Sequence, residues 1–222
     1  MEEEFDISCY VIEKKHFSTL EIKDSFINDL KRVAIDGLKF EVSDSSILPE
    51  QKEHWEIFHN FKLIHNKLNE IFKDDSNEIR IRFLPKEKRY FTINILVPDD
   101  DFKLINDSIQ LMIYFMKELI KYRDIRNTTI FGSRGDLKMT DITGDIFPNA
   151  LGWWNWFNND IVNNIGKEKL LSAPIYKAEE YNDGIIWQLT EKFTDKPNVE
   201  ILKNLKALLP RDHKLRIVIG MD

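Results

Sequence analysis

Residues 147–193, which read FPNALGWWNWFNNDIVNNIGKEKLLSAPIYKAEEYNDGIIWQLTEKF, carry the strongest structural signals in this chain. They include four of the five tryptophans, namely Trp153, Trp154, Trp156 and Trp187. Side chains of this size bury so much area that a dense group of them must either pack in a core or bind a partner. Two turn signals, Pro148-Asn149 and Asn182-Asp183-Gly184, indicate that the segment is built from short elements.

The residues around the tryptophans leave two interpretations open. Residues 150–157 are either a strand or the start of a helix, because an apolar run of this length suits both. In a strand, Trp154 and Trp156 share one face, and Trp153 and Phe157 share the other. The three neighbouring tryptophans then cannot all be buried on one face, so at least one is a candidate for contact with a partner, and the alternative is that all of them lie in the core.

The segment that follows is predicted to contain a helix and a β-hairpin. The helix covers residues 158–164 and ends at Gly166. Strands at 173–179 and 185–190 are joined by the tight turn at Asn182-Asp183-Gly184. A last helix begins near Pro197, and residues 215–219 form a closing strand.

The N-terminal part of the chain alternates strands and helices. Strands are predicted at 5–12, 38–42, 78–84, 89–97 and 128–131, and helices at 18–33, 49–71 and 102–122. The 49–71 helix is favoured by apolar residues at four-three-four-three spacing, which are Ile57, Phe61, Ile64, Leu68 and Ile71. The pattern predicts an α+β fold, in which an antiparallel or mixed sheet packs against several amphipathic helices in a single domain over residues 1–222.

The composition is that of an ordinary globular chain, with 42% hydrophobic and 32% charged residues among 222. The net charge of -6 argues against a nucleic-acid partner and would speed association with a basic protein. The single cysteine, Cys9, excludes an intrachain disulfide. The acidic start, Met1-Glu2-Glu3-Glu4, is unlike a secretory signal, and no apolar run is long enough to span a membrane. A cytoplasmic protein without a membrane partner is therefore expected.

No residue pattern indicates a metal or a cofactor. His54, His59 and His65 are five and six residues apart, and two imidazoles on a helix reach one zinc ion at a spacing of about four. The sequence also lacks the phosphate-binding pattern Gly-x-x-x-x-Gly-Lys-Ser/Thr. We expect neither a metal nor a cofactor.

Two groups of aspartates are candidates for partner contacts. They are Asp99, Asp100 and Asp101, and Asp141 and Asp145. The first group precedes the 102–122 helix, where carboxylates suit the positive N-terminal end. The second group suggests a weaker alternative, because paired carboxylates can act as acid and base. An uncharacterised enzyme would then use Asp141 and Asp145 together with Arg134.

Residues 148–209 resemble a known family. The motifs are Gly152-Trp153 followed by an aromatic pair, then Ala173-Pro174, Asp183-Gly184 before an apolar strand, Leu189-Thr190, and Phe193 before a final helix. In this order they resemble the C-terminal region of bacterial immunity proteins, most of all the immunity protein 52 family of polymorphic-toxin and type VI secretion systems.

The resemblance implies a protein that binds and neutralises a cognate toxin and catalyses no reaction. The partner is then a toxin protein, which could be basic. The expected contact residues are Trp153, Trp154 and Trp156 together with the aspartates at 99, 100, 101, 141 and 145. Another inhibitor or interaction module, carried by a phage or a plasmid, is the alternative.

Overall fold

The computed structural model describes residues 4–14, 29, 32, 39–47, 57–64, 78–83, 90–98, 102–134, 147–209 and 215–217. The expected helix at 18–33, the three aspartates at 99–101, and Asp141 with Asp145 lie wholly or almost wholly outside these ranges. The described elements confirm an α+β fold, in which helices pack on both faces of an antiparallel sheet.

Nine strands form the main sheet in the order β2-β3-β4-β5-β1-β6-β8-β10-β9. They are β1 (Glu4–Glu13), β2 (Lys39–Ile47), β3 (Ile57–Ile64), β4 (Glu78–Phe83), β5 (Tyr90–Pro98), β6 (Ile125–Arg134), β8 (Trp154–Phe157), β9 (Lys177–Tyr181) and β10 (Gly184–Gln188). Every neighbouring pair is antiparallel. Two short strands, β7 (Ala150–Leu151) and β11 (Arg216–Ile217), pair in parallel beside it.

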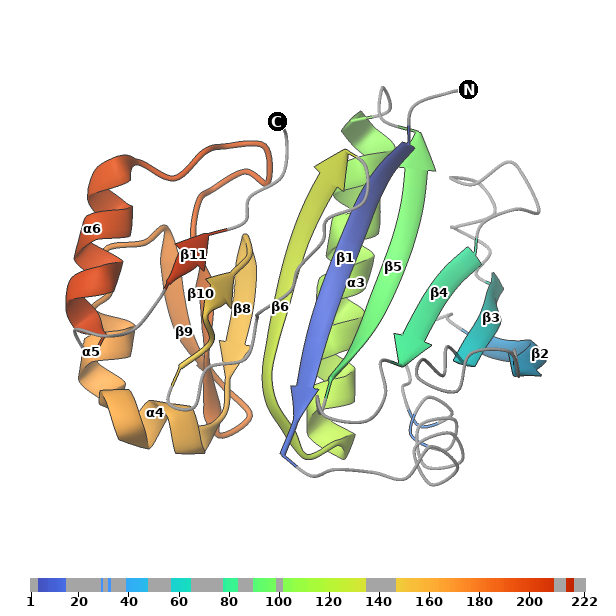
Figure 1. The fold of residues 1–222 in the computed structure, drawn as a ribbon, viewed down its shortest axis with the longest axis horizontal. Helices are drawn as coiled ribbons and strands as arrows, with labels where there is room; N and C mark the ends of the chain where they lie inside the picture. Colours follow the sequence, from blue (N-terminus) through green and yellow to red (C-terminus); the bar gives the residue numbers. More distant parts are fainter. Residues whose placement is uncertain are drawn as a thin grey trace.

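Helix α3 (Phe102–Tyr122) covers one face of the sheet along β5, β1 and β6 (Figure 1). Alternate residues of β1 point toward it, because successive side chains of a strand lie on opposite faces. Phe5, Ile7, Cys9 and Val11 are therefore fully buried. Burial also raises the pKa of the Cys9 thiol, so this cysteine is a structural core residue.

The other face of the sheet is covered at its β8–β10–β9 end by three helices (Figure 1). They are α4 (Asn159–Ile165), α5 (Lys167–Leu171) and α6 (Val199–Leu208). Trp187 of β10 is the largest side chain in this second core, and its indole nitrogen donates a hydrogen bond to the Leu170 carbonyl at 2.8 Å. Phe147 and Phe157 pack against it, with ring centroids 5.8 and 5.2 Å away.

The helix predicted at 49–71 is wrong, because residues 57–64 form β3 between β2 and β4. A short segment of aromatic and aliphatic residues suits either state, and pairing with strands on both sides favours the extended one. Other strands differ from their expected bounds. The strand expected at 173–179 begins only at Lys177, the one expected at 38–42 runs from Lys39 to Ile47, and the one expected at 128–131 runs from Ile125 to Arg134. The closing strand begins at Arg216, and the residues after Ile217 lie outside the described ranges.

No helix among the described residues is long and apolar enough to cross a membrane. The helix predicted at 102–122 is confirmed, and the apolar residues spaced along one side of it are buried, namely Ile105, Ile109, Met112, Met116 and Leu119. The turn at Asn182 and Asp183 is confirmed too, since both residues have positive φ, at 45° and 58°. Two consecutive residues with positive φ are typical of a type I′ hairpin turn.

Candidate partner-binding groove

A groove of about 560 Å³ lies between α3 and the β9–β10 hairpin. Phe102, Asn106, Gln110, Ile113 and Lys117 of the helix line one side of it. The hairpin and residues 191–194 line the other side. Trp153, Trp154 and Ile186 form part of the lining between the two walls, so the tryptophan segment builds this groove.

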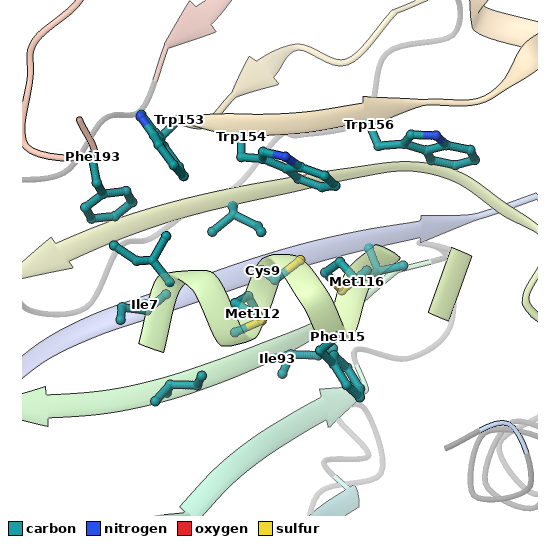
Figure 2. Close-up of a cluster of buried hydrophobic side chains, with 14 of the residues drawn as sticks. Ile7, Cys9, Ile93, Met112, Phe115, Met116, Trp153, Trp154, Trp156 and Phe193 are labelled. Carbon is teal, nitrogen blue, oxygen red and sulfur yellow. The ribbon is translucent and has the colours of Figure 1, made fainter. Parts of the chain in front are cut away.

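The three neighbouring tryptophans are all buried, with 3%, 2% and 4% exposure for Trp153, Trp154 and Trp156. Of the two alternatives that the sequence leaves open for these side chains, the structure shows burial in the core. Strand β8 begins only at Trp154, so Trp153 precedes the alternation and does not share a face with Phe157. All three belong to the core beneath α3, as Figure 2 shows. Trp153 and Trp154 line the groove, so contact between a partner and these indoles there would be limited to the edges of these two rings.

Hydrogen bonds fix the indoles of Trp153 and Trp156. Trp153 Nε1 donates to the Thr190 carbonyl at 3.0 Å, and Trp156 Nε1 donates to the Tyr181 carbonyl at 2.9 Å. Trp153 also packs edge-on against Phe193, with centroids 5.5 Å apart. These bonds hold the two rings in one orientation each, and of the two Trp153 lines the groove.

Asn155 stabilises the turn before β8, a role that the sequence did not predict. Its Oδ1 accepts from the Gly152 amide at 3.0 Å and from the Thr129 hydroxyl at 3.0 Å, and its Nδ2 donates to the Gly152 carbonyl at 2.8 Å. The side chain is fully buried, where an unpaired amide would be costly. The only sequence signal was a polar residue set between two buried tryptophans.

The groove is closed at one end by contacts between the hairpin and α3. The Tyr181 hydroxyl donates to the Lys117 carbonyl at 2.9 Å, and Asn182 Nδ2 donates to the Ile120 carbonyl at 3.1 Å. The second bond serves a carbonyl in the last turn of α3, where helical partners are missing. The Tyr181 contact thus lies at the Lys117 end of the groove, and Phe102 lies at the opposite end of the helix.

Replacing Tyr181 by phenylalanine should lower the free energy of unfolding by about 1 kcal/mol, because it removes one hydrogen bond and keeps the ring. Urea denaturation monitored by tryptophan fluorescence measures this change. Tyr176→Phe is the matched control, since Tyr176 is exposed and should change stability by less than about 0.5 kcal/mol. Equal effects of the two substitutions would show that the closing contact does not stabilise the fold.

Charges in the groove are mixed, with three lysines and two glutamates. Glu179 accepts from two ammonium groups, Lys177 at 2.6 Å and Lys117 at 3.5 Å. Burial alone would raise the pKa of Glu179, but the hydrogen bond from Lys177 and the charge of Lys117 lower it overall. Lys117 also lies 5.1 Å from the centre of the Tyr181 ring. One carboxylate shared by two cations leaves this end of the groove with an excess of positive charge.

The acidic candidates, Asp99, Asp100, Asp101, Asp141 and Asp145, lie outside the described residues. Arg134 is the last residue of β6, but Asp141 and Asp145 are not described with it, so the enzyme hypothesis stays untested. Within the described ranges, no group of three or more His, Cys, Asp or Glu side chains is placed to hold a metal ion.

The similarity of this chain to known proteins is low in both sequence and structure. No family model and no curated protein matches it. One similar solved structure is a Pseudomonas aeruginosa T6SS protein, PA0821, which is 10% identical in sequence with a TM-score of 0.48. The alignment covers 93% of this chain and 76% of that chain. This likeness concerns the course of the chain, and no residue role is carried over from it.

Proposed function

We propose that this chain is an immunity protein, which binds and neutralises a cognate bacterial toxin without catalysing a reaction. The observation that carries the proposal is the groove between α3 and the β9–β10 hairpin. Its lining includes the exposed Phe102 and the buried Trp153 and Trp154. The order of motifs in residues 148–209, which resembles bacterial immunity proteins, supports the same function.

Phe102 has the properties of a binding anchor. Its side chain is 56% exposed, although it is apolar and begins the longest described helix. Aromatic side chains at the rim of a pre-formed groove supply much of the binding energy of protein interfaces, because they lose little conformational entropy and bury a large area. A protein partner that covers the groove would remove this side chain from water.

The groove also offers polar groups that fix the orientation of a partner. Asn106 and Gln110 are exposed and line it beside Phe102, and Lys192 lies on the opposite side. A mixture of an apolar centre and a polar rim is typical of protein interfaces. The net charge of -6 favours a basic toxin during long-range encounter, while the lysines of the groove favour an acidic side chain at the contact itself.

Phe102→Ala is expected to weaken binding of the toxin by about tenfold, the effect of removing an aromatic anchor. Isothermal titration calorimetry measures the change in dissociation constant. The purified chain is titrated with the protein encoded directly upstream of its gene. Tyr114→Ala is the matched control, because Tyr114 is 59% exposed on the same helix and does not line the groove. It should change the dissociation constant by less than about twofold.

Two outcomes would contradict this assignment of the groove. One is an equal loss of affinity in both variants, which would mean that the whole exposed side of α3 is involved. The other is unchanged binding by Phe102→Ala, which would place the interface elsewhere. A phage- or plasmid-borne inhibitor of a host enzyme remains the second candidate, and it is favoured if the upstream protein does not bind at all.

A further inference from the structure

Strand β9 is the last strand of the main sheet, and among the described strands it pairs with β10 alone. It pairs with β10 in an antiparallel register that matches Tyr181 with Gly184 and Lys177 with Gln188. A two-residue loop, Asn182-Asp183, joins the two strands. Such a loop is closed by a hydrogen-bonded pair, so Tyr181, Glu179 and Lys177 direct their backbone groups toward β10.

The residues between them, Ala178 and Glu180, consequently direct their N–H and C=O groups away from β10. In the part of the chain that the structure describes, no backbone hydrogen bond reaches this outer side of β9. The side chain of Glu180 pairs with Lys167 of α5 at 2.6 Å and is still 59% exposed. An open strand edge is a template onto which another chain can add a strand.

This edge borders the groove. Lys177 and Glu179 line the groove and point to the α3 side of the sheet, whereas Ala178 packs on the opposite side with the second core. A strand added to β9 would therefore place every second side chain beside the groove. Lys177 is 52% exposed and shares Glu179 with Lys117, so the side chain opposite Lys177 must supply negative charge.

We propose that the toxin binds by adding an extended segment to β9, with an acidic side chain opposite Lys177 and an apolar side chain in the groove near Phe102. The inference rests on the proposed function and specifies how the same site recognises its partner. Main-chain hydrogen bonds to Ala178 and Glu180 supply affinity, and the groove supplies specificity.

Ala178→Pro tests this directly, because it removes the outward N–H and places a ring where the partner strand would lie. Proline is tolerated on an edge strand when its N–H would face solvent, so β9 and β10 should stay paired. Binding of the upstream protein should weaken by about 30-fold. Val199→Pro is the matched control, since Val199 is exposed at the first position of α6, where proline is accepted, and its binding should equal wild type.

Hydrogen exchange of the unaltered chain provides a second readout that needs no variant. The amides of Ala178 and Glu180 should exchange rapidly in the free chain and at least about tenfold more slowly in the complex. Wild-type affinity of a folded Ala178→Pro variant, or unchanged exchange at both amides in the complex, would overturn strand addition and leave the immunity proposal intact. Failure of the wild-type chain to bind the upstream protein would overturn both.

Discussion

Gly152→Ala is expected to lower the free energy of unfolding by about 3 kcal/mol or more, the upper end of the cost of overpacking. A Cβ atom on Gly152 would lie 2.2 Å from the Ile130 carbonyl oxygen and 2.7 Å from the carbonyl carbon. Both atoms belong to the backbone of β6, which is held on its other side by β1. Relief therefore requires the turn before β8 to move away from the sheet, which would disturb the bonds of Asn155 and the position of Trp153.

Gly166→Ala is the control that separates the steric clash at Gly152 from the backbone strain of replacing a glycine with positive φ. Gly166 has open space around it, the nearest atom being Lys169 Cδ at 3.7 Å, but its φ is +107°. Its φ and ψ of 107° and 122° lie outside the left-handed helical region, so its substitution should cost about 1–3 kcal/mol from backbone strain alone. Urea denaturation of both variants measures the difference. If Gly152→Ala costs no more than Gly166→Ala, close packing of this turn on β6 is not what the Gly-Trp motif provides.

Arg123→Met is expected to destabilise the fold by about 3–5 kcal/mol, because it removes the cation from a buried ionic cluster. Arg123 follows α3 directly, and its side chain is 2% exposed. Its Nε binds Glu13 at the end of β1, and its Nη1 lies 2.9 Å from Asp29 Oδ2. Methionine has a similar length and leaves two carboxylates facing each other without the guanidinium.

The pH dependence of this loss identifies its cause. Burial raises the pKa of Glu13 even though the hydrogen bond from Arg123 lowers it. Without the guanidinium the pKa rises further, so the folded state holds a proton that the unfolded state releases. The deficit of Arg123→Met should therefore be largest at neutral pH and shrink as the pH falls toward the ordinary pKa of a glutamate.

Arg32→Met is the control for this cluster. Arg32 Nη1 lies 3.6 Å from Asp29 Oδ1, but the Arg32 side chain is 65% exposed. An exposed pair of this kind contributes little, so its loss should change stability by less than about 0.5 kcal/mol at any pH. Equal losses for Arg32→Met and Arg123→Met, or a deficit for Arg123→Met that does not vary with pH, would contradict the account of a buried cluster.

The sequence pattern predicts elements whose conformation depends on residues close together in the chain. The bounds of α3 follow from the spacing of its apolar residues, and the hairpin turn follows from Asn182-Asp183-Gly184, whose residues tolerate positive φ. Strand β3 could not be predicted from local spacing. Its state depends on pairing with β2 and β4, and the spacing of Ile57, Phe61 and Ile64 suits a helix equally well.

The groove could not be predicted, because it depends on contacts between distant parts of the chain. Lys117 and Glu179, for example, are 62 residues apart in the sequence and 3.5 Å apart in the structure. Composition identified the tryptophans as important but could not tell packing from binding. Their burial follows from the place where β8 begins and from the helix that covers it, which are properties of the assembled sheet.

The most direct test of the proposed function is a count of survivors. The open reading frame directly upstream is expressed in a bacterial host alone, with this chain, and with the Phe102→Ala variant. We expect the upstream protein to kill when expressed alone, the wild-type chain to restore the colony count of an empty-vector strain, and Phe102→Ala to protect less. An upstream protein that is harmless, or that kills equally with and without this chain, would contradict the immunity proposal.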